Sequence, residues 1–170
     1  MLTHFTRRSA DGDAMDNLVA ILREGLIRGS TRMVRTKRDV VCLFDASLSE
    51  LNRLLEPDNR RRYEPFGIAM DKRYAFAMGA RPVIYLPWPE ACQMLNEEDL
   101  WRVVGIDLNP TPPVDWTFER EWRIAERLKL PSSAVALVET WDDVDDLFER
   151  FEGKPPCTGV IPLKNLFGST

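Results

Sequence analysis

Two glutamates and an arginine recur at every second position of residues 118–123, which read FEREWR. The alternation predicts a β-strand over residues 117–125, with Glu119, Glu121 and Arg123 on one face. Two interpretations are open. Either the charged face is a solvated strand surface whose ion pairs each contribute little, or it is the wall of a cleft. In a cleft, a glutamate would act on a substrate hydroxyl and an arginine would bind the substrate's anion.

His4 is the only histidine of the chain. It lies two residues before Thr6 in a segment that predicts a short strand over residues 2–6, so the two side chains share a face. A single histidine near a terminus is usually a partly exposed polar residue or a structural one. Because imidazole offers a donor and an acceptor, His4 and Thr6 could instead bind a sugar hydroxyl.

Neither a metal site nor a phosphate-binding loop is predicted. One histidine excludes motifs with two histidine ligands, such as HExxH. The chain contains neither GxGxxG nor the P-loop motif. The cysteines lack CxxC spacing, and we interpret them as reduced thiols in the core of an intracellular protein. They are Cys42, Cys92 and Cys157.

Length and charge indicate one domain without a strong overall charge. A chain of 170 residues fits a single domain over residues 1–170. With 27 acidic and 23 basic residues, the net charge of -4 does not attract the whole chain to nucleic acid or to a membrane. The N-terminal residues carry no apolar leader, and no stretch is long enough to span a bilayer, so we expect a soluble cytoplasmic protein.

Helices early in the chain and strands later predict the α+β class. Apolar residues at helical spacing predict a helix over residues 14–24 that ends at Gly25. Ser47 and Glu50 form a capping box that opens another helix. Further helices are predicted over residues 72–78, 89–95 and 142–152, the last with Val144, Leu147, Phe148 and Phe151 inward. Strands are predicted over residues 40–44, 66–70, 82–86, 101–108, 134–139 and 160–163.

Basic residues cluster in two segments of this acidic chain. Loops of this kind are usually only solvated. Their separation from the acids at residues 139–152 suggests a local positive face for phosphate, which a nucleic acid target could supply. Few aromatic residues interleave the bases, which argues against recognition of a stacked single strand. The acidic helix could meet a basic partner or shield this face. The candidate target-binding residues are Arg32, Arg35, Lys37 and Arg38 in a loop that also holds Arg28, together with Arg60, Arg61 and Arg62.

The order of several short blocks resembles the AbiGi-like abortive-infection family of bacteria. The blocks run from residue 4 to residue 123, and their order and spacing carry the resemblance. They are HFT at residues 4–6, NLVAIL at 17–22 with Gly25, VCLFD at 41–45, FGIAMDK at 66–72, RPVIY at 81–85 and EWR at 121–123.

That family is similar in turn to ADP-ribosyltransferases, especially the DNA-modifying DarT toxins. These also begin with a His-x-Thr strand, followed by the Asn-Leu-x-x-Ile-Leu-x-x-Gly helix found here at residues 17–25. The resemblance implies an ADP-ribosyltransferase-like domain with two small packed β-sheets and flanking helices. It also implies an NAD pocket between the sheets, in which NAD is a substrate and no metal is required.

The resemblance also implies roles for single residues. His4 and Thr6 would hold the nicotinamide ribose, and Tyr85 would line the nicotinamide pocket by stacking. Glu121 would be the catalytic carboxylate that stabilises the cationic sugar, with Glu119 as the alternative. We therefore expect Glu121→Gln to lower activity about 100-fold and to leave folding intact. The pyrophosphate would be bound by Lys72, Arg81 or Arg123.

Three hypotheses of function follow. The first is an NAD-using toxin or effector of phage defence that transfers ADP-ribose to nucleic acid or protein. The second is a non-catalytic antitoxin or regulator that binds a cognate toxin or antitoxin protein. The third is a binding domain whose charged strand is only surface. A cleft that joins His4, Tyr85 and Glu121 favours the first hypothesis, and separated, exposed positions favour the others.

Overall fold

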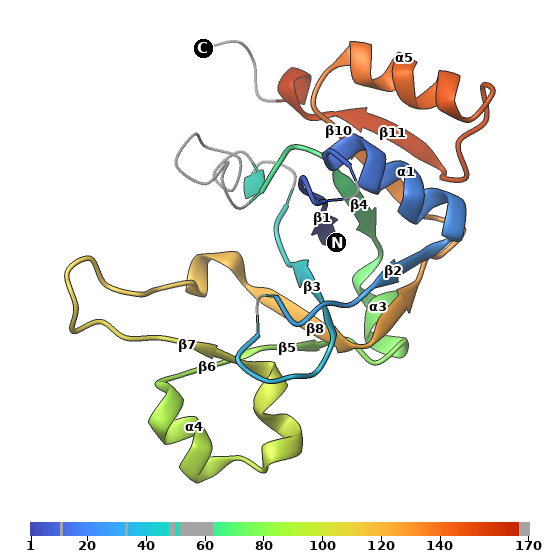
Figure 1. Cartoon of the computed structure of the whole chain (residues 1–170). Helices are drawn as coiled ribbons and strands as arrows, with labels where there is room; N and C mark the ends of the chain where they lie inside the picture. The colour runs from blue at the N-terminus through green and yellow to red at the C-terminus, as the bar shows by residue number, and fades with distance from the viewer. Residues whose placement is uncertain (11, 33, 48–49, 52–62, 167–170) are drawn as a thin grey trace.

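Short runs of β-branched and aliphatic residues build the central β-sheet, because such side chains pack well on a pleated surface that is buried. The computed structural model describes residues 1–166 apart from 11, 33, 48–49 and 52–62. There, seven strands form a mixed sheet in the order β11-β10-β4-β1-β3-β8-β5 (Figure 1). They are β1 (Leu2–Phe5), β3 (Val40–Phe44), β4 (Gly67–Met70), β5 (Arg81–Pro82), β8 (Glu121–Ala125), β10 (Val135–Val138) and β11 (Gly159–Pro162).

Two pairs of short strands complete the β-structure of the described residues. β2 (Leu26–Arg28) pairs antiparallel with β9 (Arg127–Lys129), and β6 (Ile84–Leu86) pairs parallel with β7 (Val103–Gly105). The strands thus form one large sheet and two ribbons, which differs from the two small packed sheets expected. The α+β class is confirmed, because helices and mostly antiparallel strands form one compact domain.

Helix α1 (Ala14–Glu24) has the predicted bounds, because local signals mark both of its ends. Asp13 forms a capping box with Asp16, and Gly25 ends the helix in the left-handed conformation at φ 63°. The other helices are α3 (Lys72–Ala77), α4 (Trp88–Met94) and α5 (Trp141–Arg150), with the 3₁₀ helices η1 (Glu97–Arg102), η2 (Thr117–Glu119) and η3 (Leu163–Leu166).

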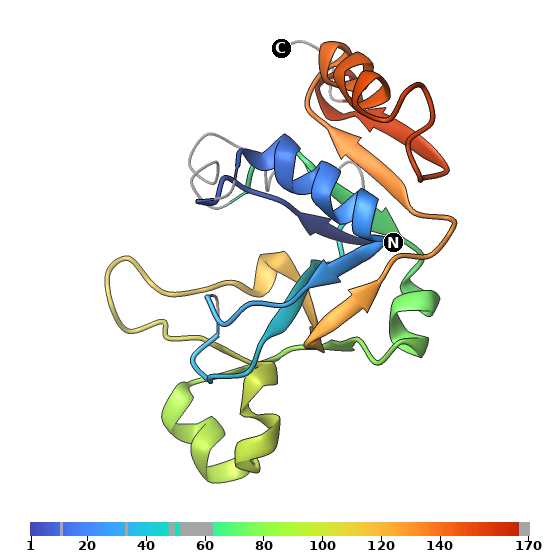
Figure 2. The ribbon, with the colours of Figure 1, turned by 45° about the vertical axis from the view of Figure 1, so that its right-hand side comes forward.

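Helices α4 and α5 mark opposite ends of the molecule. α5 lies beside β11 at one end, and α4 and η1 lie beside the β6–β7 ribbon at the other, in both views (Figures 1 and 2). None of the described helices is long and apolar enough to cross a membrane.

The two faces of β3 and β8 have different roles. The antiparallel register sets Cys42 opposite Arg123 and Phe44 opposite Glu121, so these four side chains share a face. Leu43, between them, points to the other face and is fully buried in the apolar core together with the inner residues of α1. One face therefore stabilises the fold, and the opposite face is left for a site.

The predicted strand over residues 117–125 begins later than expected. Residues 117–119 form η2, and Arg120 is left-handed at φ 44°, so that β8 starts at Glu121. The reason is local hydrogen bonding. The carboxylate of Asp115 accepts from the N–H and the hydroxyl of Thr117 at 2.9 and 2.7 Å, which favours a turn over strand pairing.

Other predicted strands are shorter or interrupted. Val83 divides the strand predicted over residues 82–86 into β5 and β6, which belong to different sheets. The strand predicted over residues 101–108 is reduced to β7, because η1 extends to Arg102. Arg28, predicted to lie in the basic loop, is instead the last residue of β2, which pairs with β9 far along the chain.

Some side chains lie elsewhere than their spacing predicts. Phe148 is 40% exposed on α5, because Val144 and Leu147 occupy the inner face of that helix. Cys92, predicted in the core, is exposed on α4, where Ala91 faces inward. The helix predicted to open at Ser47 lies largely outside the described residues.

Candidate active site

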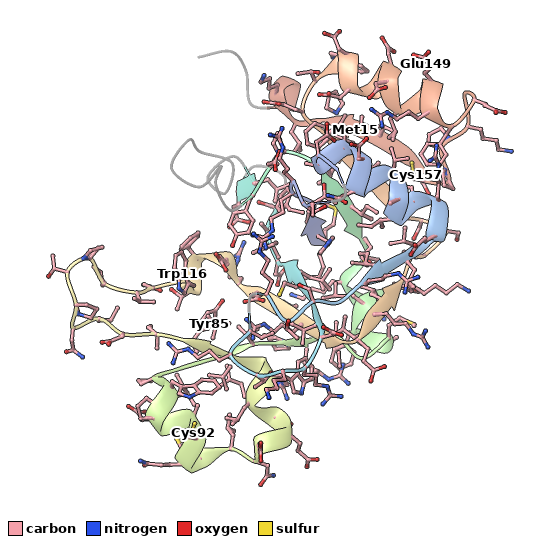
Figure 3. All side chains as sticks on the ribbon, viewed as in Figure 1. Met15, Tyr85, Cys92, Trp116, Glu149 and Cys157 are labelled. Atoms are coloured by element: carbon pink, nitrogen blue, oxygen red, sulfur yellow. The ribbon has the colours of Figure 1, made fainter. Side chains whose placement is uncertain are left out.

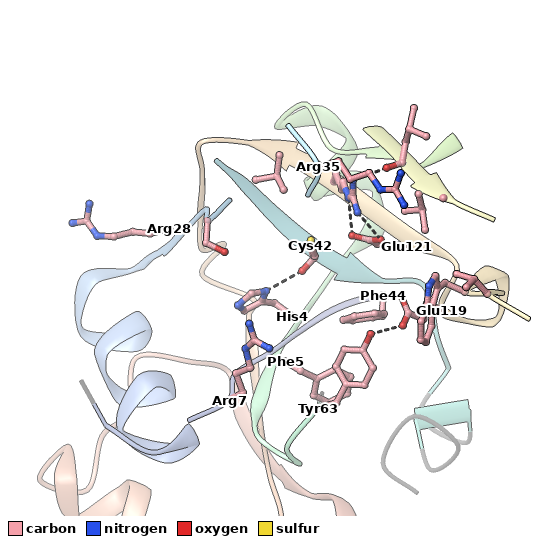
Figure 4. Close-up of a pocket in the computed structure, with 18 residues that line it drawn as sticks. His4, Phe5, Arg7, Arg28, Arg35, Cys42, Phe44, Tyr63, Glu119 and Glu121 are labelled. Atoms are coloured by element: carbon pink, nitrogen blue, oxygen red, sulfur yellow. Dashed lines mark hydrogen bonds and ion pairs between the residues drawn. The ribbon is translucent and has the colours of Figure 1, made fainter. Parts of the chain in front are cut away.

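A pocket of about 290 Å³ opens on the face of the sheet that carries Glu121 and Arg123 (Figure 4). Its lining comes from Tyr63 and from five other parts of the chain that lie far apart in the sequence. They are β1 and the residues after it, β2 with the loop that follows, β3, β7, and the segment from residue 114 to β8. Strand pairing across the sheet brings these parts together.

Three charged side chains of this pocket are buried. The exposed fractions of Glu119, Glu121 and Arg123 are 4%, 6% and 3%. The interpretation of a solvated strand surface is therefore wrong, and the charged residues line a cleft instead. Although Glu119 lies before the strand, the turn at Arg120 returns its carboxylate to the same pocket.

Arg123 and Glu121 form a buried ion pair. Nε and Nη2 of Arg123 donate to the two carboxylate oxygens of Glu121 at 2.8 and 3.2 Å. Nη1 donates to the backbone carbonyls of Trp101 and Val103 at 2.7 and 3.1 Å. These bonds use four of the five N–H groups of a guanidinium. Arg123 thus positions Glu121 and the β7 wall, rather than serving as the pyrophosphate ligand that we expected.

Glu119 contacts an aromatic cluster. Its carboxylate accepts a hydrogen bond from the hydroxyl of Tyr63. The ring of Tyr63 packs edge-on against Phe44, with centroids 4.9 Å apart, and lies 6.2 Å from Phe5. Sequence reasoning missed Tyr63, because nothing local distinguishes it and 56 residues separate it from Glu119.

His4 lines the pocket from β1. Its Nδ1 lies 2.9 Å from the carbonyl oxygen of Cys42. Because a carbonyl can only accept, Nδ1 carries the proton, and Nε2 of the neutral ring is an acceptor. Burial lowers the pKa of His4 below its ordinary value, which favours this neutral form. The site thus offers one imidazole lone pair to a ligand hydroxyl.

Thr6 does not line the pocket. It is buried, and its hydroxyl donates to the carbonyl of Ala14 at 2.7 Å, which ties β1 to the start of α1. Its position therefore does not support the role of ribose ligand expected for Thr6. Its function is to hold the segment that carries His4.

Tyr85 contacts the backbone of Glu121 but is not one of the residues that line the pocket. The hydroxyl of Tyr85 accepts a hydrogen bond from the backbone N–H of Glu121 at 3.1 Å. The ring lies on β6 and is not among the lining side chains, so the expected stacking on nicotinamide is not supported by its position (Figure 3). The lining aromatic residues are Phe5, Phe44, Tyr63 and Trp116.

Lys72 and Arg81 lie outside the pocket, which corrects their expected role with pyrophosphate. Lys72 pairs with Asp45, and its Nζ lies 4.9 Å from the ring centroid of Trp122 on the other face of β8. Arg81 donates to the carbonyls of Phe76 and Ala80 and stacks on Phe76 at 4.0 Å. Strand pairing decides which of these side chains face the pocket, and the local sequence does not specify that pairing.

Three arginines besides Arg123 line the pocket. They are Arg7 after β1, Arg28 in β2 and Arg35 in the following loop. Arg28 and Arg35 belong to the basic segment recognised in the sequence, whereas Arg7 was missed. Arg32, Lys37 and Arg38 are exposed beside this group and do not line the pocket, and Arg60, Arg61 and Arg62 lie outside the described residues.

Two tryptophans lie against the basic loop. The guanidinium carbon of Arg35 is 5.3 Å from the ring centroid of Trp88, and that of Arg38 is 5.2 Å from the ring centroid of Trp101. Few aromatic residues interleave the bases along the chain, but α4 and η1 supply them in space. This packing holds the basic loop against α4 and η1, beside the pocket.

The acidic helix does not shield the basic loop. α5 lies at the end of the molecule opposite α4, against which the basic loop packs (Figures 1 and 2). Its Arg150 pairs with Asp16 of α1 at 2.8 Å. The shielding hypothesis is therefore wrong for this loop, and the other basic segment, residues 60–62, lies outside the described residues.

Comparisons with protein-family models, with curated proteins and with solved structures found no match for this chain. The site must be interpreted from its own chemistry. That chemistry comprises two buried carboxylates, a neutral imidazole, several aromatic rings and four guanidinium groups, one of which is paired with Glu121. The described residues contain no group of three or more histidine, cysteine, aspartate or glutamate side chains placed to hold a metal ion.

Proposed function

We propose that the pocket binds NAD and that the protein is an ADP-ribosyltransferase-like toxin or effector of phage defence. The observation that carries the proposal is the meeting of Glu119, Glu121 and His4 in one pocket. Segments that lie more than a hundred residues apart in the sequence supply them. A solvated, purely structural strand face would not gather these groups in a cavity.

The pocket has the size and polarity of a site for part of a dinucleotide. A volume of about 290 Å³ is near the lower limit of about 300–1,000 Å³ for sites of drug-sized ligands. We infer that the nicotinamide ribose enters the pocket and that the rest of NAD lies along the arginines. Trp116 and Tyr63 offer aromatic rings to nicotinamide, and Nε2 of His4 accepts from a ribose hydroxyl.

The arginines of the pocket suit the pyrophosphate. Guanidinium groups bind phosphate oxygens through pairs of parallel hydrogen bonds. Arg7, Arg28 and Arg35 replace Lys72, Arg81 and Arg123 as the candidate ligands. The first three line the pocket, whereas Lys72 and Arg81 lie outside it and Arg123 uses four of its five N–H groups within the protein.

The reaction follows from the carboxylates. The bond between nicotinamide and ribose C1′ breaks, and its electron pair leaves with nicotinamide. An adjacent carboxylate stabilises the oxocarbenium-like sugar. The acceptor's nucleophile then bonds to C1′, and its proton passes to a carboxylate. Glu121 is our first choice for this role because Arg123 fixes its position, and Glu119 is the alternative.

We propose a phosphate-bearing acceptor, nucleic acid in preference to protein, that binds at the basic loop. The loop of Arg32, Arg35, Lys37 and Arg38 adjoins the pocket through Arg35, and Arg28 lies beside it. An acceptor held there would reach C1′ of the ribose. Phosphate contacts of this kind give affinity that falls as salt increases.

One observation favours a second function, a non-catalytic antitoxin or regulator that binds a partner protein. Both carboxylate oxygens of Glu121 already accept from Arg123. A glutamate whose two oxygens are paired with an arginine stabilises the oxocarbenium-like sugar less than an unpaired glutamate would. In this case the pocket would bind a nucleotide without turnover.

Nicotinamide release and NAD binding, measured on the same purified protein, distinguish the two functions. The protein is incubated with NAD and total cellular nucleic acid, alongside Glu119→Gln, Glu121→Gln and the exposed control Glu97→Gln. Release that is lost in one pocket variant but kept in the control, while thermal unfolding shows both folded, supports the transferase. NAD binding without release supports the regulator. Absence of both binding and release contradicts the NAD site.

A further inference from the structure

Helix α5 presents an aromatic stripe to solvent. Trp141 and Phe148 are 58% and 40% exposed, whereas Val144 and Leu147 are buried against the sheet. Seven residues correspond to nearly two full turns, so the two aromatic side chains lie on one stripe of the helix. Large exposed aromatic residues at fixed positions are typical of the centres of protein interfaces.

Acidic side chains flank this stripe. Asp142, Asp145 and Glu149 are exposed, and no side chain of the described residues forms an ion pair with them. The remaining acids of the helix have structural partners. Asp143 closes the capping box with Thr140, and Asp146 pairs with Arg150 at 2.9 Å.

The helix is held rigidly in place. Its N-terminus is capped, its inner face is buried, and Arg150 connects its last turn to Asp16 of α1 at 2.8 Å. No residue of α5 lines the pocket, and the helix lies at the far end of the molecule from α4 (Figure 1). The stripe is therefore a preformed surface separate from the candidate active site.

We propose that this face of α5 docks a basic segment of a different protein, with apolar side chains on the aromatic stripe and lysine or arginine side chains against the three acids. Charge complementarity decides the occupant. Nucleic acid and anionic lipid would be repelled by the acids. A two-fold dimer through this face would set acids against acids.

The experiment uses a synthetic amphipathic peptide with a lysine- and arginine-rich face and a leucine face. Its affinity is measured for the full chain, for Trp141→Ala with Phe148→Ala, and for the reversal Asp142→Lys, Asp145→Lys and Glu149→Lys. The matched control reverses three exposed acids near the other end, Glu90→Lys, Glu97→Lys and Glu98→Lys. Thermal unfolding shows that each variant is folded.

We expect the peptide to bind the wild type and the control equally, and to lose at least about tenfold in affinity in each α5 variant. Absence of binding to the wild type, or an equal loss in the control, would overturn the proposal. Self-association of the wild type in sedimentation, abolished by the α5 variants, would overturn it in favour of a second copy. None of these outcomes depends on whether the pocket binds NAD.

Discussion

Arg123 holds both carboxylate oxygens of Glu121 two residues before it on the same strand, at 2.8 and 3.2 Å, with both side chains at most 6% exposed. Residues i and i+2 of a strand share a face, which makes the pair possible without any bend of the backbone. The pair lines the pocket, and the bonds of Arg123 to backbone carbonyls of η1 and β7 connect it to those two elements.

Removing one member of this pair should destabilise the protein. Glu121→Gln leaves a buried guanidinium without its counter-charge, which costs about 3–5 kcal/mol of the free energy of unfolding. This corrects the expectation that Glu121→Gln leaves folding intact. Urea unfolding measures the loss. The double variant Glu121→Leu with Arg123→Met should recover most of it, and equal stability of Glu121→Gln and the wild type would contradict the buried pair.

Glu119→Gln tests a pocket carboxylate with little cost in stability. The amide oxygen of glutamine can still accept from the hydroxyl of Tyr63. We expect the urea midpoint to change little and nicotinamide release to fall about 100-fold if Glu119 is the catalytic carboxylate. Unchanged release would assign that role to Glu121 or to neither.

Tyr85→Phe should impair positioning more than ligand binding. The change removes the acceptor for the backbone N–H of Glu121, which starts β8. We expect a loss of about 1 kcal/mol in stability and slower nicotinamide release at an unchanged Kd for NAD. Tyr74→Phe is the control, since it removes a hydroxyl that donates to Lys129 O at 2.9 Å away from the pocket. Equal effects of the two variants on release would contradict a positioning role.

The arginines of the pocket and Lys72 should differ in their effect on NAD binding. Arg28→Met with Arg35→Met should raise the Kd for NAD about tenfold or more, because a hydrogen bond to a charged group contributes about 1.5–3 kcal/mol. Lys72→Met, outside the pocket, should leave the Kd within about twofold. Calorimetric titration measures both, and the opposite ranking would contradict our assignment of the pyrophosphate ligands.

His4 should make stability depend on pH in the acidic range. Its pKa in the folded protein lies below 6.5 because burial disfavours the charged ring. As the pH falls, His4 therefore binds a proton in the unfolded chain at a higher pH than in the folded protein. The free energy of unfolding that the neutral ring contributes is complete above pH 6.5 and is lost as the pH falls through the pKa of the folded state. Because His4 is the only histidine, NMR titration of its ring protons reports this pKa directly. A value at or above 6.5 would contradict the buried, neutral ring.

The same comparison of stability across pH can be made on His4→Asn. The asparagine amide can still donate to the carbonyl of Cys42 but does not titrate. We expect the urea midpoint of the wild type to fall more steeply between neutral pH and about pH 5 than that of the variant. Parallel pH profiles would show that other groups dominate acid destabilisation.

Local signals explain which elements were predictable. The bounds of α1 follow from a capping box at Asp13 and a glycine at residue 25, both within one turn of its ends. The strand over residues 40–44 follows from five consecutive residues that favour β-structure. The strand predicted over residues 117–125 begins only at Glu121, because the carboxylate of Asp115 bonds to Thr117 and favours a turn there. The alternation of charges gave no sign of this turn.

The sequence by itself determined the α+β class, the principal helices and strands, and the placement of Glu121 and Arg123 on one strand face, because each depends on neighbours in the chain. Only the tertiary structure decided that this face is buried, that Tyr63 and Arg7 join it, and that Lys72 and Arg81 do not. The physical reason is that strand order and register set which distant side chains share a face. These depend on packing across the whole sheet rather than on local preference.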